Sequence, residues 1–306
     1  MQKTLKAPVT FRGRGLHKGR AVRMVLRPAS ADYGIWFSRI DLPLADSLIP
    51  AHWDAVVASK LCTLIGNASG ASVSTIEHLM AALAGLGVNN CLIEIDGPEV
   101  PILDGSAAPY VQGILERGLR NQGEAVRAIR ILKTIEVAEG ETFARLEPAD
   151  MLEIDFRIDF EEEGIGHQSR RLNLSNGAFV RELCDSRTFC LQSDVEAMRS
   201  KGLALGGTLE NAVVFDGGKV LTPGGLRHPD EPVRHKMLDA MGDLALAGGP
   251  ILGRYIGHRA GHSLTNRLLR KLFATPGAWA LVDCVGTTMG KLPGVGVVRK
   301  DLPAYA

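Results

Sequence analysis

Residues 233–243 read Val233-Arg-His-Lys-Met-Leu-Asp-Ala-Met-Gly-Asp243, and they predict the helix around which the fold is organised. An apolar stripe recurs there at steps of four, four and three residues, through Val233, Met237, Met241 and Leu244. This spacing is typical of a helix face that packs against a core. A polar stripe recurs every four residues, through His235, Asp239 and Asp243.

Two interpretations of the polar stripe are open. In the first, the stripe and the neighbouring Lys236 form an exposed helix face in contact with water. In the second, the imidazole of His235 and the carboxylate of Asp239 bind one metal ion, because they lie one turn apart on the same side of the helix. If this side is covered, its charges need such a partner, since an unpaired buried charge is costly. A second acid and imidazole pair, Glu77-His78, favours the metal site.

The chain of 306 residues is long enough for two domains, each with its own core. The polar, glycine-containing segment 118–126 predicts a boundary between domains 1–125 and 126–306. Each half supplies strands and then a helix with a histidine in its first turns, which is a weak sign of duplication with a site between the halves. A strand, helix, strand pattern at about 191–218 indicates an insertion in the second domain.

Periodicity and turn residues predict the other elements. Helical patterns cover the end of the run 73–86, then about 108–117, 175–183 and 193–200, and a last helix opens at Gly261. Strand patterns cover 91–96, 129–137, 142–146, 152–160, a segment near Arg171, 211–215, 251–257 and 279–285.

Composition excludes several classes of protein. The net charge of +1, with 23% charged residues, shows no footprint of nucleic-acid binding. The five cysteines are odd in number and dispersed, which indicates free thiols in a reducing compartment. The chain begins without a signal-peptide pattern and has no apolar run of about 18 residues, so we expect a cytoplasmic protein without a transmembrane segment. The basic residues from Arg12 to Arg27 suggest transient contact with a membrane surface.

Glu77 has two competing interpretations. Ser74 precedes it by three residues, which is the spacing of a capping box, in which the glutamate would bond the backbone at the start of its own helix. Alternatively, Glu77 faces the metal beside His78, and we predict this arrangement. The glycine-rich run 13–19 matches neither a P-loop nor a dinucleotide fingerprint, and it predicts a hairpin connection with an exposed His17.

The hypothetical ligand set His78, His235 and Asp239 has the composition of a catalytic zinc site. Two nitrogens and one oxygen leave a position open for water, whereas structural sites usually have four protein ligands. A bound cation would lower the pKa of that water towards about 7, and Glu77 is placed to take its proton. The same ligands accept ferrous iron as well as zinc.

A leaving amine would need a proton from a second group. His262 is the remaining histidine at the start of a predicted helix near this set in the sequence. A helix N-terminus depresses the pKa of an imidazole, so His262 would need an acidic partner to stay charged. Asp243, one turn beyond Asp239, is the candidate partner.

Several long motifs, in the same order, resemble the zinc-dependent UDP-3-O-acyl-N-acetylglucosamine deacetylases of lipid A synthesis. They are Gly15-Leu-His-Lys-Gly19, Ser74-Thr-Ile-Glu-His-Leu-Met-Ala-Ala-Leu-Ala-Gly-Leu-Gly87, Pro101-Ile-Leu-Asp-Gly-Ser-Ala-Ala-Pro109, Ser186-Arg-Thr-Phe189, the central stretch 233–243 and Gly261-His-Ser-Leu264. The resemblance runs from about residue 2 to residue 285.

The resemblance implies an α+β fold of two similar two-layer α/β sandwich domains with the active site between them. It implies a cytoplasmic amidase that removes acetate from UDP-3-O-(3-hydroxyacyl)-N-acetylglucosamine, in the committed step towards lipopolysaccharide. Separately, we expect a monomer, although the sequence does not determine the oligomeric state. In this family the insertion of the second domain forms an apolar passage for the acyl chain, which corresponds to about 191–218 here.

The resemblance also assigns roles to individual residues. The zinc ligands fall on His78, His235 and Asp239. The remaining roles are a general base at Glu77, a general acid at His262 with Asp243 as its partner, an oxyanion-stabilising hydroxyl at Thr188, and substrate contacts at Lys236 and Phe189.

This chain departs from the family pattern at two places. It has Gly-His-Ser-Leu-Thr-Asn where the family usually has Gly-His-Ala-Leu-Asn-Asn, and Cys190 and Leu191 replace Gly-Phe beside the expected passage. The preferred acyl length therefore stays open. Two other functions also stay open: a non-catalytic, metal-dependent nucleotide-sugar binding protein, and a hydrolase of another acylated sugar or thioester.

Overall fold

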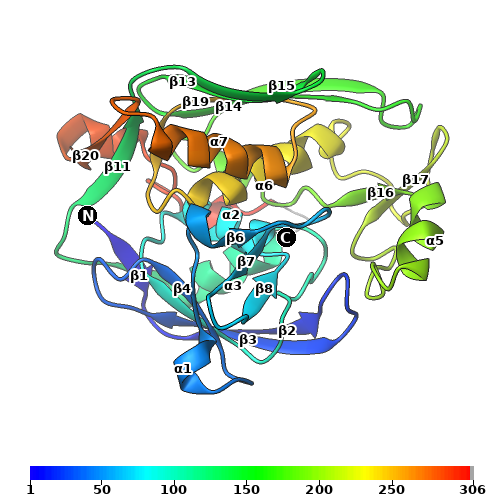
Figure 1. The fold of residues 1–306 in the computed structure, drawn as a ribbon, viewed down its shortest axis with the longest axis horizontal. Helices are drawn as coiled ribbons and strands as arrows, with labels where there is room; N and C mark the ends of the chain where they lie inside the picture. Colours follow the sequence, from blue (N-terminus) through cyan, green and yellow to red (C-terminus); the bar gives the residue numbers. More distant parts are fainter. Residues whose placement is uncertain (304–306) are drawn as a thin grey trace.

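The computed structural model describes residues 1–303 and is an α+β fold in which helices lie between two main β-sheets (Figure 1). The sheet of the first half lies at the bottom of Figure 1 and that of the second half at the top. Helices α2 (Glu77–Leu86), α3 (Ala108–Arg117), α6 (Glu231–Ala245) and α7 (His262–Ala274) fill the space between them. The expected α+β sandwich architecture is confirmed.

The first half is built on a five-stranded sheet with the order β2-β3-β9-β4-β5. Its strands are β2 (Val9–Arg14), β3 (Ala21–Pro28), β9 (Cys91–Ile95), β4 (Ile35–Arg39) and β5 (Leu48–Pro50). On β9, buried Cys91, Ile93 and Ile95 alternate with half-buried Leu92 and Glu94, as expected for a strand with one face on the core. The helices α2 and α3 cover that face.

The second half is built on a seven-stranded sheet whose main path is β12-β13-β19-β11-β20, with β14 joined to β19 and β15 joined to β14. Its strands are β11 (Val126–Ile131), β12 (Ile135–Glu139), β13 (Thr142–Pro148), β14 (Leu152–Asp159), β15 (His167–Asn173), β19 (Ile251–His258) and β20 (Trp279–Cys284). The predicted strand 129–137 is wrong in one respect, because a bend at residue 133 and irregular backbone on either side of it divide the strand into β11 and β12.

Smaller elements complete the described chain. Three small sheets consist of β1 (Lys3–Leu5) with β10 (Leu119–Asn121), of β6 (Val56–Val57), β7 (Leu64–Gly66) and β8 (Ser72–Ser74), and of β16 (Phe189–Leu191), β17 (Val213–Asp216) and β18 (Lys219–Val220). Short helices are α1 (Leu44–Ser47), η1 (Trp53–Ala55), α4 (Ala178–Glu182), η2 (Gly286–Lys291) and η3 (Arg299–Asp301). The predicted insertion is the third small sheet with helix α5 (Gln192–Ser200).

Helices α2 and α6 pack against each other at the centre, each between its own sheet and the other helix (Figure 1). This position buries nine of the ten residues of α2 and twelve of the fifteen residues of α6. The apolar stripe of the central stretch is buried as predicted. The exposed-face interpretation of the polar stripe is wrong, because the other half of the chain covers it, leaving His235 3%, Asp239 5% and Asp243 3% exposed.

The hairpin connection between β2 and β3 is confirmed, but the prediction of an exposed His17 is wrong. Its side chain is 7% exposed, because residues Leu205 and Gly206 of the insertion bond the backbone carbonyls of His17 and Leu16 and close over the turn. The Glu99 carboxylate also holds the turn in place, because it accepts hydrogen bonds from the backbone amides of His17 and Lys18.

Two further properties follow from the described residues 1–303. All five cysteines are free thiols, as predicted, and four of them are buried. None of the helices in this part of the chain combines the length and apolar character needed to cross a bilayer. The division into domains at residue 125 stays a prediction.

Candidate active site

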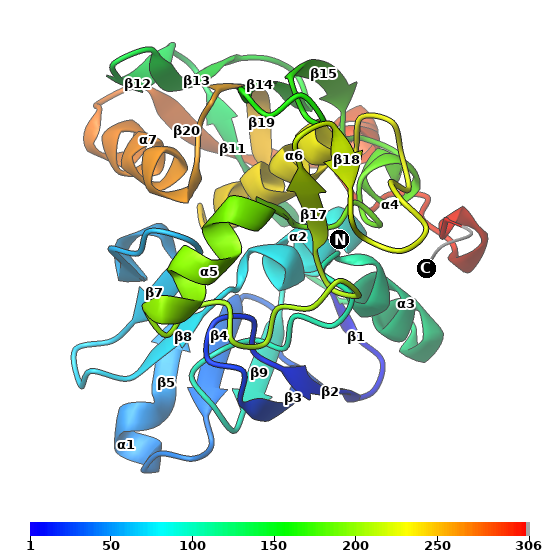
Figure 2. The same ribbon diagram turned by 90° about the vertical axis from the view of Figure 1, so that its right-hand side faces the viewer.

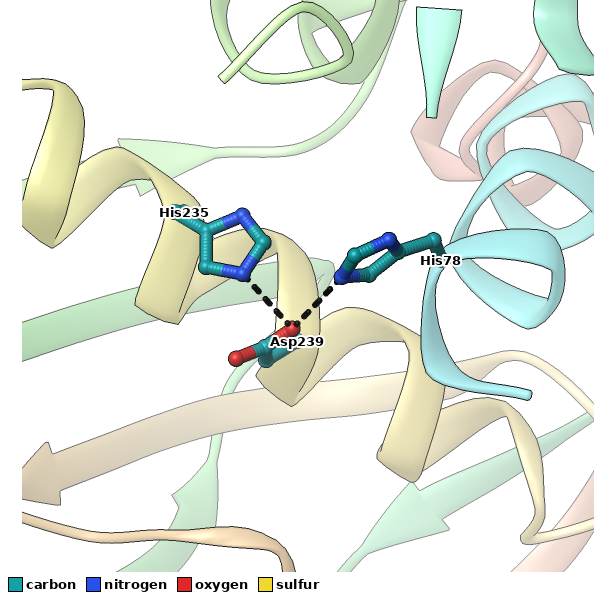
Figure 3. A group of neighbouring side chains, drawn as sticks. All are labelled: His78, His235 and Asp239. Atoms are coloured by element: carbon teal, nitrogen blue, oxygen red, sulfur yellow. Dashed lines mark ion pairs between the residues drawn. The ribbon is translucent and has the colours of Figure 1, made fainter. Parts of the chain in front are cut away.

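The side chains of His78, His235 and Asp239 converge where α2 and α6 meet (Figure 3). His78 lies in the first turn of α2, and the other two lie one turn apart on α6. Both imidazole Nε2 atoms point to the same carboxylate oxygen, at 3.6 Å from His78 and 3.4 Å from His235 to Asp239 Oδ1. One potential ligand atom from each residue lies within 4.8 Å of the others, and all three residues are buried. The geometry of one helix explains only why His235 and Asp239 are close to each other on α6. His78 joins them because α2 packs against α6.

The hydrogen bonding of this group fits a divalent cation. In the part of the chain that the structure describes, Asp239 Oδ1 is buried without a hydrogen-bond partner, while its Oδ2 accepts a bond of 2.8 Å from Lys236 Nζ. His235 Nδ1 lies 3.0 Å from the Ser186 carbonyl, so it carries the proton and leaves the lone pair of Nε2 free for a metal. Burial lowers the pKa of His235 to about 4, so its ring is neutral at pH 7, as a ligand must be.

Glu77 does not form the capping box that Ser74 suggested. Ser74 belongs to β8, and its amide bonds the Pro98 carbonyl. Helix α2 begins only at Glu77, and no side chain of residues 1–303 caps its start. Instead, Glu77 Oε2 accepts a bond of 3.0 Å from the Thr63 amide, and its Oε1 lies 3.9 Å from His262 Nε2. Burial raises the pKa of Glu77, despite the nearby imidazoles. A carboxylate with a raised pKa is suited to accept a proton near neutral pH.

His262 is the first residue of α7, and Asp243 orients it. Asp243 Oδ2 lies 2.8 Å from His262 Nδ1, so Nε2 points towards Glu77 and towards Asp239 Oδ2 at 4.0 Å. Burial alone would lower the pKa of His262, but the charges of Asp243 and Glu77 outweigh it and raise the pKa to about 9. His262 is therefore protonated at neutral pH, although the amino end of a helix disfavours a positive charge.

Lys236, Phe189 and Thr188 differ in how they relate to this centre. Lys236 contacts it directly through its bond to Asp239. The ring of Phe189 lies 6.2 Å from that of His235, centroid to centroid, at an angle of 81°. Thr188 is held by its backbone, which bonds Gly105 and Val213, and within residues 1–303 its hydroxyl has no hydrogen bond to the other site residues.

Three residues that sequence reasoning missed support the site. Thr63 bonds two acids at once, through its amide to Glu77 and through its hydroxyl to Asp243 at 2.5 Å. Ser186 supplies the carbonyl that orients His235. Gly242 lets the helices approach, because a Cβ atom there would lie 2.0 Å from the Glu77 carbonyl oxygen. The sequence held a signal for two of them: Ser186 opens one of the motifs shared with the deacetylase family, and a glycine inside a strong helical pattern, as at position 242, usually has a packing reason.

The arrangement combines three chemical capacities in one buried place. It has a ligand set with an unsatisfied carboxylate oxygen, a carboxylate with a raised pKa, and an imidazolium held by an aspartate. The last two lie on neighbouring elements within 4 Å of each other. Such a set can polarise a carbonyl, deprotonate water and protonate a leaving group.

Comparisons with known proteins agree with this chemistry. A sequence model of the family described as UDP-3-O-acyl N-acetylglycosamine deacetylase matches residues 2–274. A UDP-3-O-acyl-N-acetylglucosamine deacetylase of Phenylobacterium zucineum is 50% identical over 278 residues, covering 91% of this chain and 95% of that protein. Proteins with the same name from an Anaeromyxobacter species and from Pasteurella multocida are 47% and 45% identical, and they cover 99% and 92% of this chain and 97% and 92% of their own lengths.

With a match over most of its length and buried groups that suit hydrolysis, the chain belongs to the UDP-3-O-acyl N-acetylglycosamine deacetylase family.

Proposed function

We propose that this protein hydrolyses the N-acetyl group of UDP-3-O-(3-hydroxyacyl)-N-acetylglucosamine in the cytoplasm, releasing acetate and a free amine. This reaction would be the committed step of lipid A synthesis. The observation that carries the proposal is the convergence of three buried ligand groups, Glu77 and the His262–Asp243 pair where α2, α6 and α7 meet. Family membership supports the choice of substrate.

His78, His235 and Asp239 would hold a divalent cation, either zinc or ferrous iron. When bound, the ion supplies Lewis acidity, which lowers the pKa of water and polarises the amide carbonyl. The unpartnered Oδ1 of Asp239 and the fixed tautomer of His235 support this assignment. Lys236 donates a hydrogen bond to Oδ2 of Asp239 and balances its negative charge. It would also contact the substrate.

Glu77 and His262 divide the proton transfers between them. Glu77 takes a proton from the attacking water, which its raised pKa favours at neutral pH. His262 gives its proton to the departing nitrogen, and Asp243 keeps the imidazole charged until then. The Thr188 hydroxyl stabilises the developing oxyanion, and the Phe189 ring packs against the substrate. After these two transfers Glu77 holds one extra proton and His262 lacks one, so a net proton transfer from Glu77 to His262, directly or through solvent water, must restore both groups before the next turnover.

Single-turnover acetate release from the acylated UDP-sugar tests the proposal. Glu77→Gln and His262→Gln should keep one metal ion per chain but lose about a hundredfold to ten-thousandfold in rate, the usual contribution of general acid and base catalysis. Glu141→Gln, which changes an exposed carboxylate of the second half, serves as the control and should keep the wild-type rate.

The same experiment separates the competing functions. Wild type that binds substrate and metal but releases no acetate would instead be a nucleotide-sugar binding protein. Faster hydrolysis of another acylated sugar or of a thioester would show that this compound is the substrate and that the same residues catalyse its hydrolysis.

A further inference from the structure

Positive charge is concentrated at the start of the chain. Residues 1–31 contain eight lysines and arginines and no aspartate or glutamate, so this segment carries +8 in a chain whose net charge is +1. Most of these cations belong to the β2–β3 hairpin. The molecule is thus strongly asymmetric in charge although its total is near neutral.

Five cations of the hairpin are exposed, and we call them the hairpin cations: Arg12, Arg14, Lys18, Arg20 and Arg23. Among residues 1–303 none of the five forms an ion pair with an acid, although Asp96 accepts a hydrogen bond from the Arg23 amide and Arg14 bonds the Gly19 carbonyl. Arg12 and Arg23 are direct neighbours across the two strands. Like charges at such a pair destabilise a sheet, so folding alone gives no reason for them.

An exposed apolar side chain of the insertion, that of Leu205, adjoins the tip of the hairpin. The insertion bonds the turn through the amides of Leu205 and Gly206, and the backbone of Leu205 packs on Gly19, between Lys18 and Arg20. The Leu205 side chain is nevertheless 53% exposed, and that of Leu209 is 42% exposed. Figure 2 looks onto this side of the molecule, with α5 of the insertion in front and β2 and β3 below it.

We propose that the hairpin cations and the exposed leucines of the insertion dock transiently on a bilayer that contains anionic phospholipids. The cations complement lipid phosphates, and the leucines enter the boundary between headgroups and acyl chains, as in other interfacial anchors. A nucleic acid would use the cations but not the leucines. The choice of a lipid surface also rests on the proposed function, since an acylated substrate is most concentrated at such a surface.

Vesicle sedimentation without substrate tests the docking surface. Wild type should sediment with vesicles of equal parts phosphatidylglycerol and phosphatidylcholine, and not with phosphatidylcholine alone. Because each cation near an anionic surface contributes about a fivefold factor, Arg12→Gln with Arg20→Gln and Arg23→Gln should weaken partitioning on the order of a hundredfold. Added salt should weaken wild-type binding as well. Leu205→Ser should reduce the binding that persists in high salt.

A matched triple variant controls for net charge. Arg171→Gln with Arg267→Gln and Lys271→Gln removes three exposed charges from β15 and α7, on the upper side of the molecule in Figure 1, and should bind anionic vesicles like wild type. The proposal would be overturned if both triple variants lost vesicle binding equally, or if the wild-type protein did not bind anionic vesicles. Retention of wild type on duplex DNA without vesicle binding would show that the face serves another polyanion.

Acetate release separates this proposal from the proposed function. Without vesicles, the hairpin variant should deacetylate dissolved substrate at the wild-type rate, because no hydrogen bond or ion pair within the described residues joins Arg12, Arg20 or Arg23 to the active site. Loss of vesicle binding with intact catalysis supports the docking surface, whereas vesicle binding by a protein without deacetylase activity would overturn only the enzymatic proposal.

Discussion

Asp243 sets the protonation state of His262 through a single hydrogen bond of 2.8 Å. Its charge, together with that of Glu77, raises the pKa of the imidazole to about 9, so His262 keeps its proton at neutral pH and loses it only as the pH rises through that value. Asp243→Asn removes the charge and lowers this pKa. We expect a rate loss of roughly tenfold to a hundredfold near pH 7, and an alkaline limb of the kcat/KM profile that moves to lower pH. If the variant is slower but the alkaline limb of its kcat/KM profile stays at the same pH, Asp243 has only a packing role.

Gly242 determines how closely the two central helices approach. A Cβ atom at this position would lie 2.0 Å from the Glu77 carbonyl oxygen, so Gly242→Ala must push α2 away from α6. Such overpacking costs about 1–3 kcal/mol of unfolding free energy, and it should also weaken metal binding, because His78 moves with Glu77. Urea unfolding and metal titration measure both effects. Gly123→Ala, where an added Cβ would have no neighbour within 4 Å among the residues described by the structure, should change neither.

At the scale of elements, the loop before β7 links the two halves of the site. Thr63 belongs to the first half, yet its hydroxyl bonds Asp243 on α6, and its amide bonds Glu77 on α2. Thr63→Val keeps the amide but leaves the buried Asp243 carboxylate short of one donor. We expect a loss of about 1–3 kcal/mol in unfolding free energy and a lower rate. Thr63→Ser, which retains the hydroxyl, should stay near wild type, and an equal loss in both variants would contradict the role of this bond.

At the scale of the whole molecule, the proposed metal site joins both halves of the chain. One ligand lies on α2 and two on α6, so a bound ion stabilises the native contact between the helices and not the unfolded chain. By linkage, free ion at a thousand times its Kd contributes about 4 kcal/mol. Calorimetry should show that a chelator lowers the Tm of wild type and leaves that of His78→Ala unchanged. A chelator effect of equal size in both proteins would place the ion elsewhere.

Much of the fold and of the candidate site could be predicted before the structure. The helices at 108–117 and 231–245 and the strand at 91–95 follow from local periodicity, which side-chain alternation and helical spacing express directly. The pairing of His235 with Asp239 also follows from one helical turn. The capping-box alternative for Glu77 is wrong because a short sheet holds Ser74 outside the helix. The predicted exposure of His17 is wrong because a segment almost two hundred residues away covers its side chain.

By itself, the sequence determined which side chains share a face of each helix and which motifs match a deacetylase family. Only the tertiary structure decided that the polar face of α6 is buried against α2, that Glu77 meets His262, and that Thr63 and Gly242 serve the site. The reason is physical: local periodicity depends on neighbours a few residues apart, whereas burial and pKa values depend on what the other half of the chain places against each side chain.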